Sequence, residues 1–326
     1  MTHRTAIRSV LVIVVLALIA ASCGDSSDSA ADTVDTAVQE GTVRTQSSEA
    51  LVQELPVTVQ LLDAGDEPRE LLRYTIPDGQ IETLFMTQTA TEQFTYDGNE
   101  APASPTAVFE TSMVVTVTST GGSYREESEI TSMVSAGGTD PALTTQIDSV
   151  LERLVGIANV SLLDDRGRLL EQAYADPAQL ADFNASLIRL LGDTEAVAQS
   201  PVPLPLEAVG IGSRWKTVDY PSLFDFETKR TSTFELIGLD GSLVEVRVST
   251  QLEADRGTEI GDDGFVVTIE QWGSTTEGAV TIDLRATVPT SSSTSVLEQV
   301  LSTTEGSQTF EVVQVSTSTA EVTPGT

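Results

Sequence analysis

The chain has 326 residues, of which 40 % are hydrophobic, 49 are acidic and 17 are basic, so its formal net charge is −32 at pH 7. This charge repels the phosphates of nucleic acids and of anionic lipids, which excludes both as partners of the soluble part. The single cysteine excludes a disulfide within the chain, so the fold must depend on a hydrophobic core.

Residues 1–22 have the pattern of an export signal. Arg4 and Arg8 precede twelve apolar residues at 10–21, too few for the roughly 20 of a membrane-spanning helix. Cleavage after residue 22 removes both arginines and the only histidine, His3, and leaves 15 basic against 49 acidic residues, a formal charge of −34. Without histidine, Ser-His-Asp and Cys-His catalysis are impossible and zinc would have only carboxylate ligands. The sequence therefore predicts no catalytic residue, metal or cofactor.

Cys23 follows this segment, and the chain becomes polar at once in residues 24–28. The small residues before Cys23 resemble the lipobox of bacterial lipoproteins, although Ala20 stands where that motif usually has leucine. The resemblance implies that Cys23 becomes the mature N-terminus and carries a thioether-linked diacylglycerol. It predicts a protein exported and anchored on the outer face of the cell membrane. The alternative is an ordinary secretory signal, with Cys23 free or removed.

The remaining chain divides by composition. Residues 23–50 are rich in Ser, Asp, Ala and Thr without a sustained apolar period, and are predicted to form a disordered tether. Two β-rich lobes are predicted at 51–200 and 201–326, the second with a frayed tail from Ser316. A hairpin pattern recurs at an offset of 120 residues, which suggests that the lobes are related by duplication.

Apolar and polar residues alternate through most of both lobes. This period of two predicts antiparallel strands with one wet face, and it is clearest at residues 113–117, 244–248, 265–269 and 280–286. Hairpin turns are indicated by Asp78-Gly79, Gly121-Gly122, Asp240-Gly241 and Asp263-Gly264. The predicted fold class is α+β and mainly antiparallel β, with two similar curved-sheet lobes and a few amphipathic helices.

Helices are predicted where the period changes to 3.6. Residues 140–156 and 176–192 each begin with Asp-Pro and end with Gly, which are matched boundary signals. A shorter helix is predicted at residues 295–301. The apolar stripe of the second helix is expected to pack across a curved sheet and line an apolar cavity with Leu180, Phe183 and Leu187.

Trp215 and Trp272 are the only tryptophans, and each lies near a predicted strand end. They are candidates for the mouth of the same cavity, where an amphipathic ring would contact both an apolar ligand and water. Packing in the core is the simpler interpretation and is favoured.

Residues 203–215 resemble a segment of uncharacterised actinobacterial lipoproteins of two-part, β-rich build. The order of strands and helices behind a lipobox is also similar, more loosely, to the half-barrel lipid-carrier lipoproteins of mycobacteria and to the lipoprotein-localisation carriers. These resemblances imply a curved sheet backed by helices around an apolar cavity.

The sequence thus predicts a non-catalytic lipoprotein that binds a lipid or other apolar ligand. The alternative is a structural or protein-interaction module of the cell envelope, whose protein partners the sequence does not name. A hydrolase that acts by carboxylates alone is a third hypothesis, although 49 acidic residues make the presence of candidate pairs uninformative.

Overall fold

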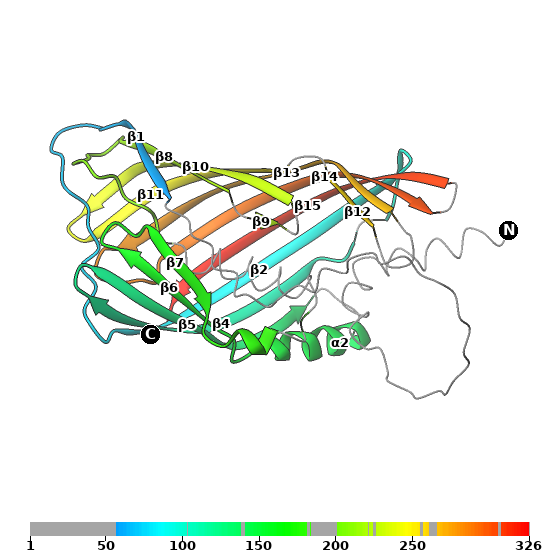
Figure 1. The fold of residues 1–326 in the computed structure, drawn as a ribbon, viewed down its shortest axis with the longest axis horizontal. Coiled ribbons are helices and arrows are strands. Elements are labelled where there is room, and N and C mark those ends of the chain that lie inside the picture. The colour runs from blue at the N-terminus through cyan, green and yellow to red at the C-terminus, as the bar shows by residue number, and fades with distance from the viewer. Residues whose placement is uncertain are drawn as a thin grey trace, which may run out of the picture.

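A computed structural model describes residues 57–102, 104–137, 141–180, 183, 201–220, 222–223, 226–254, 257–260, 266–305 and 308–325. These residues form one antiparallel sheet of 15 strands with few helices, which confirms the predicted fold class (Figure 1). The predicted tether and Cys23 lie outside the described residues. The strands are β1 (Thr58–Asp63), β2 (Ile81–Tyr96), β3 (Asn99–Glu100), β4 (Ala107–Thr120), β5 (Ser123–Gly137), β6 (Ala158–Asp164), β7 (Leu169–Tyr174), β8 (Arg214–Asp219), β9 (Ser222–Leu223), β10 (Phe226–Asp240), β11 (Leu243–Ala254), β12 (Gly257–Ile260), β13 (Val266–Asp283), β14 (Thr290–Glu305) and β15 (Gln308–Pro324).

The strand order shows how the two predicted lobes are joined. The main path is β1-β8-β10-β11-β13-β14-β15-β2-β4-β5-β6-β7, with β3, β9 and β12 as short additions. The strands from β2 to β7 and those from β8 to β15 each form a meander, and the two meanders meet where β15 pairs with β2 from Val312↔Tyr96 to Pro324↔Leu84. β1 of the first predicted lobe pairs with β8 at the far edge of the second. The lobes therefore share a sheet, and their relation by duplication stays a prediction.

The sheet is strongly curved, with β8 and β10 at the top of Figure 1, β14, β15 and β2 behind, and β4 to β7 below. Because side chains alternate between the two faces of a strand, one residue in two points to the concave side, where the core lies. We call the end that contains the β4–β5, β10–β11 and β13–β14 turns the closed end, and the opposite end the open end.

Two loop segments cover the closed end. The segment after β1 and the segment before β8 are joined by a bridge between Glu70 and Val209. The Tyr74 hydroxyl donates to the Val202 carbonyl at 3.2 Å, and the Tyr124 hydroxyl of β5 donates to the Tyr74 carbonyl at 2.7 Å. These contacts hold the two loops against the sheet and bury the core beneath them.

The helical predictions have mixed outcomes. The first predicted helix is present as α2 (Pro141–Leu151), which continues in the 3-10 helix η1 (Glu152–Leu154). Of the second, the structure describes only the 3-10 turn η2 (Pro177–Leu180) and Phe183, and the rest lies outside the described residues.

Two predictions about the second lobe are wrong. Residues 295–301 belong to β14, not to a helix, because hydrogen bonding to β13 on one side and β15 on the other outweighs the local apolar spacing. The tail predicted to fray from Ser316 is part of β15, where Val322 is fully buried. Its Ser and Thr residues suit a strand whose faces are only half-buried.

Candidate functional site

The concave face at the closed end is filled by the protein's own side chains. Trp215 and Phe234 stack with ring centroids 5.6 Å apart, and Trp215 is 0 % exposed. The Trp215 Nε1–H donates to the Pro203 carbonyl at 2.8 Å, which satisfies the polar edge of the buried ring. Leu236 and Val246 beside them are also fully buried. Trp215 therefore packs as a core residue.

The next level of the concave face is a row of hydroxyl groups. The pairing register aligns one such residue on each of six neighbouring strands, Thr217, Ser232, Thr250, Thr276, Ser295 and Ser318. The hydroxyls of Ser232 and Thr250 are 2.9 Å apart, and those of Thr276 and Ser295 are 2.7 Å apart. Each hydroxyl offers one donor and two acceptor positions, so these pairs keep bonding capacity.

Apolar residues return at the open end, where Trp272 is buried but most of the others are only half-buried. The register aligns four of them across β13, β14, β15 and β2, namely Ile269, Leu301, Val312 and Tyr96. Leu252 and Leu297 lie between this row and the hydroxyls and are also half-buried. The open end therefore carries apolar surface that the described residues do not fully cover.

Polar pairs lie beside this apolar surface and within it. Beside it, the Arg230 Nε–H donates to both carboxylate oxygens of Asp219 at 3.0 Å, and the Asp219 side chain is 4 % exposed. Within it, Gln299 lies between Leu297 and Leu301 on β14. Gln299 bonds to Gln314, whose Nε2 donates to Glu92 Oε1 at 3.2 Å. These pairs tie neighbouring strands together where the core no longer does.

The structure places the two tryptophans predicted for the cavity mouth far apart on the sheet. Trp272 is 6 % exposed on β13 and is aligned with Thr228, six residues along β10 from the partner of Trp215. At ~3.3 Å per residue and ~4.8 Å per strand, the tryptophans are separated by roughly 20 Å along the strands and 14 Å across them.

The predicted helix stripe is described only in part. Leu180 and Phe183 are half-buried against the core, and the Arg153 guanidinium lies over the Phe183 ring at 5.0 Å. Leu187 lies outside the described residues. The cavity role of all five predicted residues stays a prediction.

Two hollows in the described part of the chain lie away from the predicted residues. The larger, about 560 Å³, lies at the closed end between the start of β2 and the β13–β14 turn, and is lined by Glu82, Leu243 and Val288 among others. The smaller, about 250 Å³, lies over β11, β13 and β14 beside Gly273. Its lining includes Val296 and Glu298, which alternate with the concave-facing residues of β14 and so belong to the convex face.

Glu126 of β5 is a buried carboxyl group that the sequence reasoning missed. It is 3 % exposed, and burial together with the nearby Glu82 raises its pKa to about 8. Burial, and in smaller part Glu126, also raise the pKa of Tyr74. The Glu82 carboxylate, unlike that of Glu126, accepts backbone hydrogen bonds from the Val288 N–H at 2.7 Å and the Thr287 N–H at 3.2 Å. The alternation of the strand indicates this burial, because Glu126 lies at an inward-facing position between Tyr124 and Ser128.

Among the described residues, no group of three or more His, Cys, Asp or Glu side chains is placed to hold a metal ion. In the same part of the chain, the helices are all too short or too polar to cross a membrane.

Comparisons with known proteins do not assign the chain to a family. No family model matches the chain, and no curated protein matches it. One similar solved structure is an outer membrane channel from Pseudomonas putida F1, with 8 % sequence identity and a TM-score of 0.25; the match covers 77 % of this chain and 97 % of the channel. A score of this size does not indicate a common fold, so the function is argued from the site.

Proposed function

We propose that this protein is a non-catalytic lipoprotein of the cell envelope that binds a lipid or other apolar ligand on the concave face of its open end. The observation that supports this is the row of half-buried apolar residues, Ile269, Leu301, Val312 and Tyr96, in one register across four strands. Covering apolar surface gains about 25 cal/mol per Å², so a ligand laid along this row would be held by burial.

Two neighbouring residues on opposite faces of β14 allow a matched test. Leu297 faces the concave side, whereas Val296 is 36 % exposed on the convex side. The full chain should bind an apolar fluorescent probe saturably and release it when lipid extract is added. Leu297→Asp should abolish probe binding and Val296→Asp should preserve it. Absence of saturable binding, or equal losses in both variants, would contradict the proposal.

The ligand itself can be sought by native mass spectrometry of the protein purified from its own cells. The proposal expects a co-purifying lipid that is reduced in Leu297→Asp. A ligand-free mass for wild type, together with no displacement by lipid extract, would argue against carriage.

The membrane anchor is the second part of the proposal. Two acyl chains, each gaining about 0.8 kcal/mol per buried methylene, anchor a protein stably where one would not. Cys23→Ala should therefore move the protein from the membrane fraction to the medium, or leave the signal uncleaved. If the variant fractionates and migrates like wild type, Cys23 is not the anchor.

A protein-interaction module is the second candidate, favoured by apolar residues on the closed-end loops. Leu71, Leu206 and Ile211 are each 51 % to 64 % exposed on the two bridged segments. Exposed apolar groups gathered in this way are typical of a contact surface. Cross-linking in intact cells should then give adducts that the Leu71→Ser/Leu206→Ser variant loses, while Leu297→Asp keeps them.

A further inference from the structure

A chain of polar side chains runs through the apolar surface of the open end. Gln299 of β14 donates to Gln314 of β15, and the Gln314 Nε2 donates to Glu92 Oε1 of β2 at 3.2 Å. The pairing register places Trp272 at one end of the two glutamines and Phe94 at the other. At ~4.8 Å per strand, the two aromatic residues are roughly 14 Å apart. Two amides therefore lie between aromatic residues in a single row.

The same amides also separate apolar residues along the strands. Leu297 and Leu301 lie two positions before and after Gln299 on the same face of β14, which at ~3.3 Å per residue is about 7 Å on either side. All three side chains are half-buried. A ligand that covers both leucines must therefore cross the amide chain.

Gln299 keeps hydrogen-bonding capacity at this crossing. A glutamine side chain has two N–H donors and one carbonyl acceptor. In the described part of the chain, Gln299 uses one donor, to Gln314, and no group donates to its Oε1. A purely apolar ligand would remove the open positions from water without replacing their hydrogen bonds, which costs binding free energy. A ligand with a hydroxyl group at this point would replace them.

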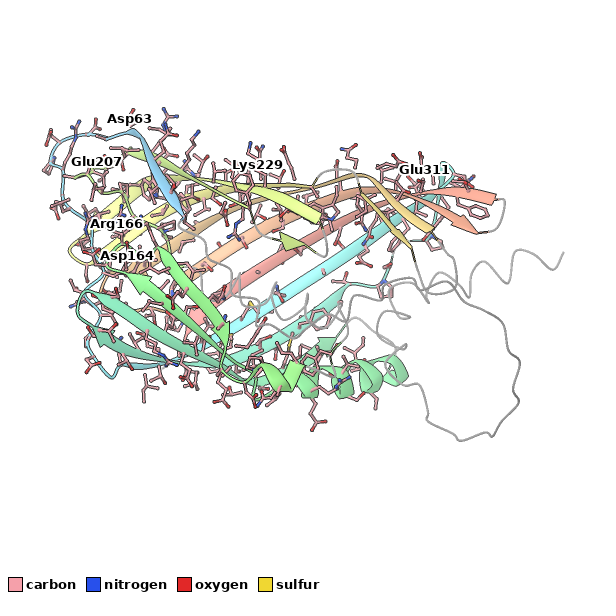
Figure 2. All side chains as sticks on the ribbon, viewed as in Figure 1. Asp63, Asp164, Arg166, Glu207, Lys229 and Glu311 are labelled. Atoms are coloured by element: carbon pink, nitrogen blue, oxygen red, sulfur yellow. The ribbon has the colours of Figure 1, made fainter. Side chains whose placement is uncertain are left out.

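The charges on this face disfavour an anionic ligand. Among the described concave positions of the open end, Arg230 is the only cation, and both carboxylate oxygens of Asp219 already accept its Nε–H at 3.0 Å. Lys229 next to it is exposed on the convex face, above the sheet in Figure 2. Burial, and in smaller part the charge of Glu92, raises the pKa of Tyr96 to about 12. The negative charge of Glu92 is thus felt within the apolar surface and would repel a phosphate.

We propose that the ligand of the open end is an amphiphile with an uncharged, hydroxyl-bearing polar group. That group lies on Gln299 and Gln314, and the apolar chain lies along Leu301 and Val312. This inference rests on the proposed function, because it requires an apolar ligand on the concave face. It adds that the amides select the ligand by its polar group.

Displacement of the apolar probe from the full chain tests this selection with four compounds that share a ten-carbon chain. They are monodecanoylglycerol, which carries hydroxyls, methyl decanoate, which has no donor, the anion decyl sulfate and the cation decyltrimethylammonium, each below its micelle-forming concentration. Monodecanoylglycerol is expected to displace the probe at a concentration about tenfold lower than each of the others, the effect of one or two hydrogen bonds. Gln299→Leu keeps the size of the side chain and should remove the preference over methyl decanoate. Gln251→Leu, at an exposed position on the convex face of β11, is the matched control and should keep it.

The outcomes separate this inference from the proposed function. No saturable probe binding to wild type would overturn the proposed function and, with it, this inference. Saturable probe binding with equal displacement by all four compounds would overturn only the selection by the polar group. A preference for any of the other three compounds would also overturn it, as would an unchanged preference in Gln299→Leu. The order of the four compounds on wild type decides the question even if Gln299→Leu folds poorly.

Discussion

The closed end and the open end are built from the same strands, but they differ in how far their side chains are buried. At the closed end, Trp215, Leu236 and Val246 are fully buried under two bridged loops. At the open end, β14 is paired along both sides, yet none of its described side chains is fully buried. Backbone pairing can therefore extend a strand well beyond the core that stabilises it. The extension offers a surface, and the closed end supplies the free energy that keeps it folded.

The largest effect expected from this comparison is on stability. Leu236 is fully buried at the closed end, whereas Leu297 is half-buried at the open end. Leu236→Ala should lower the free energy of unfolding by about 2–5 kcal/mol, because it leaves a cavity. Leu297→Ala should cost ~1 kcal/mol or less, because solvent or ligand can fill the space. Urea titration of both variants checks this, and similar losses would mean that the ends are equally packed.

The buried Glu126 makes the closed end sensitive to pH. Its folded-state pKa of about 8 lies above the ordinary value of 4.5, so the folded state holds the proton more tightly. That stabilisation is fully present below pH 4.5 and is lost as the pH rises through 8. At roughly 1.4 kcal/mol per pH unit, the loss amounts to several kcal/mol.

Glu126→Gln should therefore match wild type near pH 5 and be more stable at pH 9, as measured by denaturant titration at both values. Glu298→Gln, on the exposed face of β14, is the control and should leave the pH dependence unchanged. A wild-type-like profile for Glu126→Gln would show that another group is responsible.

The hydroxyl row marks the border between the two ends and should give the smallest effect. Ser232 is 8 % exposed and bonds to Thr250, whereas Ser292 is exposed on the outer face of β14. Ser232→Ala should cost about 1 kcal/mol, the usual value of one hydrogen bond. Ser292→Ala should change stability by less than about 0.5 kcal/mol. Thermal melts compare the two variants. Equal shifts in melting temperature would show that the hydroxyl row does not contribute to stability.

Strand alternation predicted the closed end better than the open end. Around Val244 to Val248 and Met113 to Val117, the apolar phase coincides with the buried face, so period, pairing and burial agree. In β14 the spacing of Val296, Leu297, Val300 and Leu301 also fits a helix, because a strand with two half-wet faces imposes no strict period. There the structure is decided by hydrogen bonding to β13 and β15, which the local spacing of apolar residues does not encode.

The residues of the candidate sites also differed in how well the sequence predicted them. The two tryptophans were found by their rarity, but their separation on the sheet depends on a register of β8, β10, β11 and β13 that residue types do not encode. Glu126 could have been found, since a carboxylate in the inward phase of a strand is conspicuous. The ion pair of Arg73 with Asp165 could not, because the two residues are more than 90 apart in sequence.

The pairing of β15 with β2 has a consequence for biogenesis. The last of the described strands to be synthesised lies between β14 and β2, at the junction of the two halves. A chain interrupted before Gln308 would leave the edges of both neighbours unpaired, and such edges promote aggregation and proteolysis. The chain therefore cannot complete its sheet until β15 has been synthesised. Stable accumulation of the protein would then itself report that the whole sheet has formed.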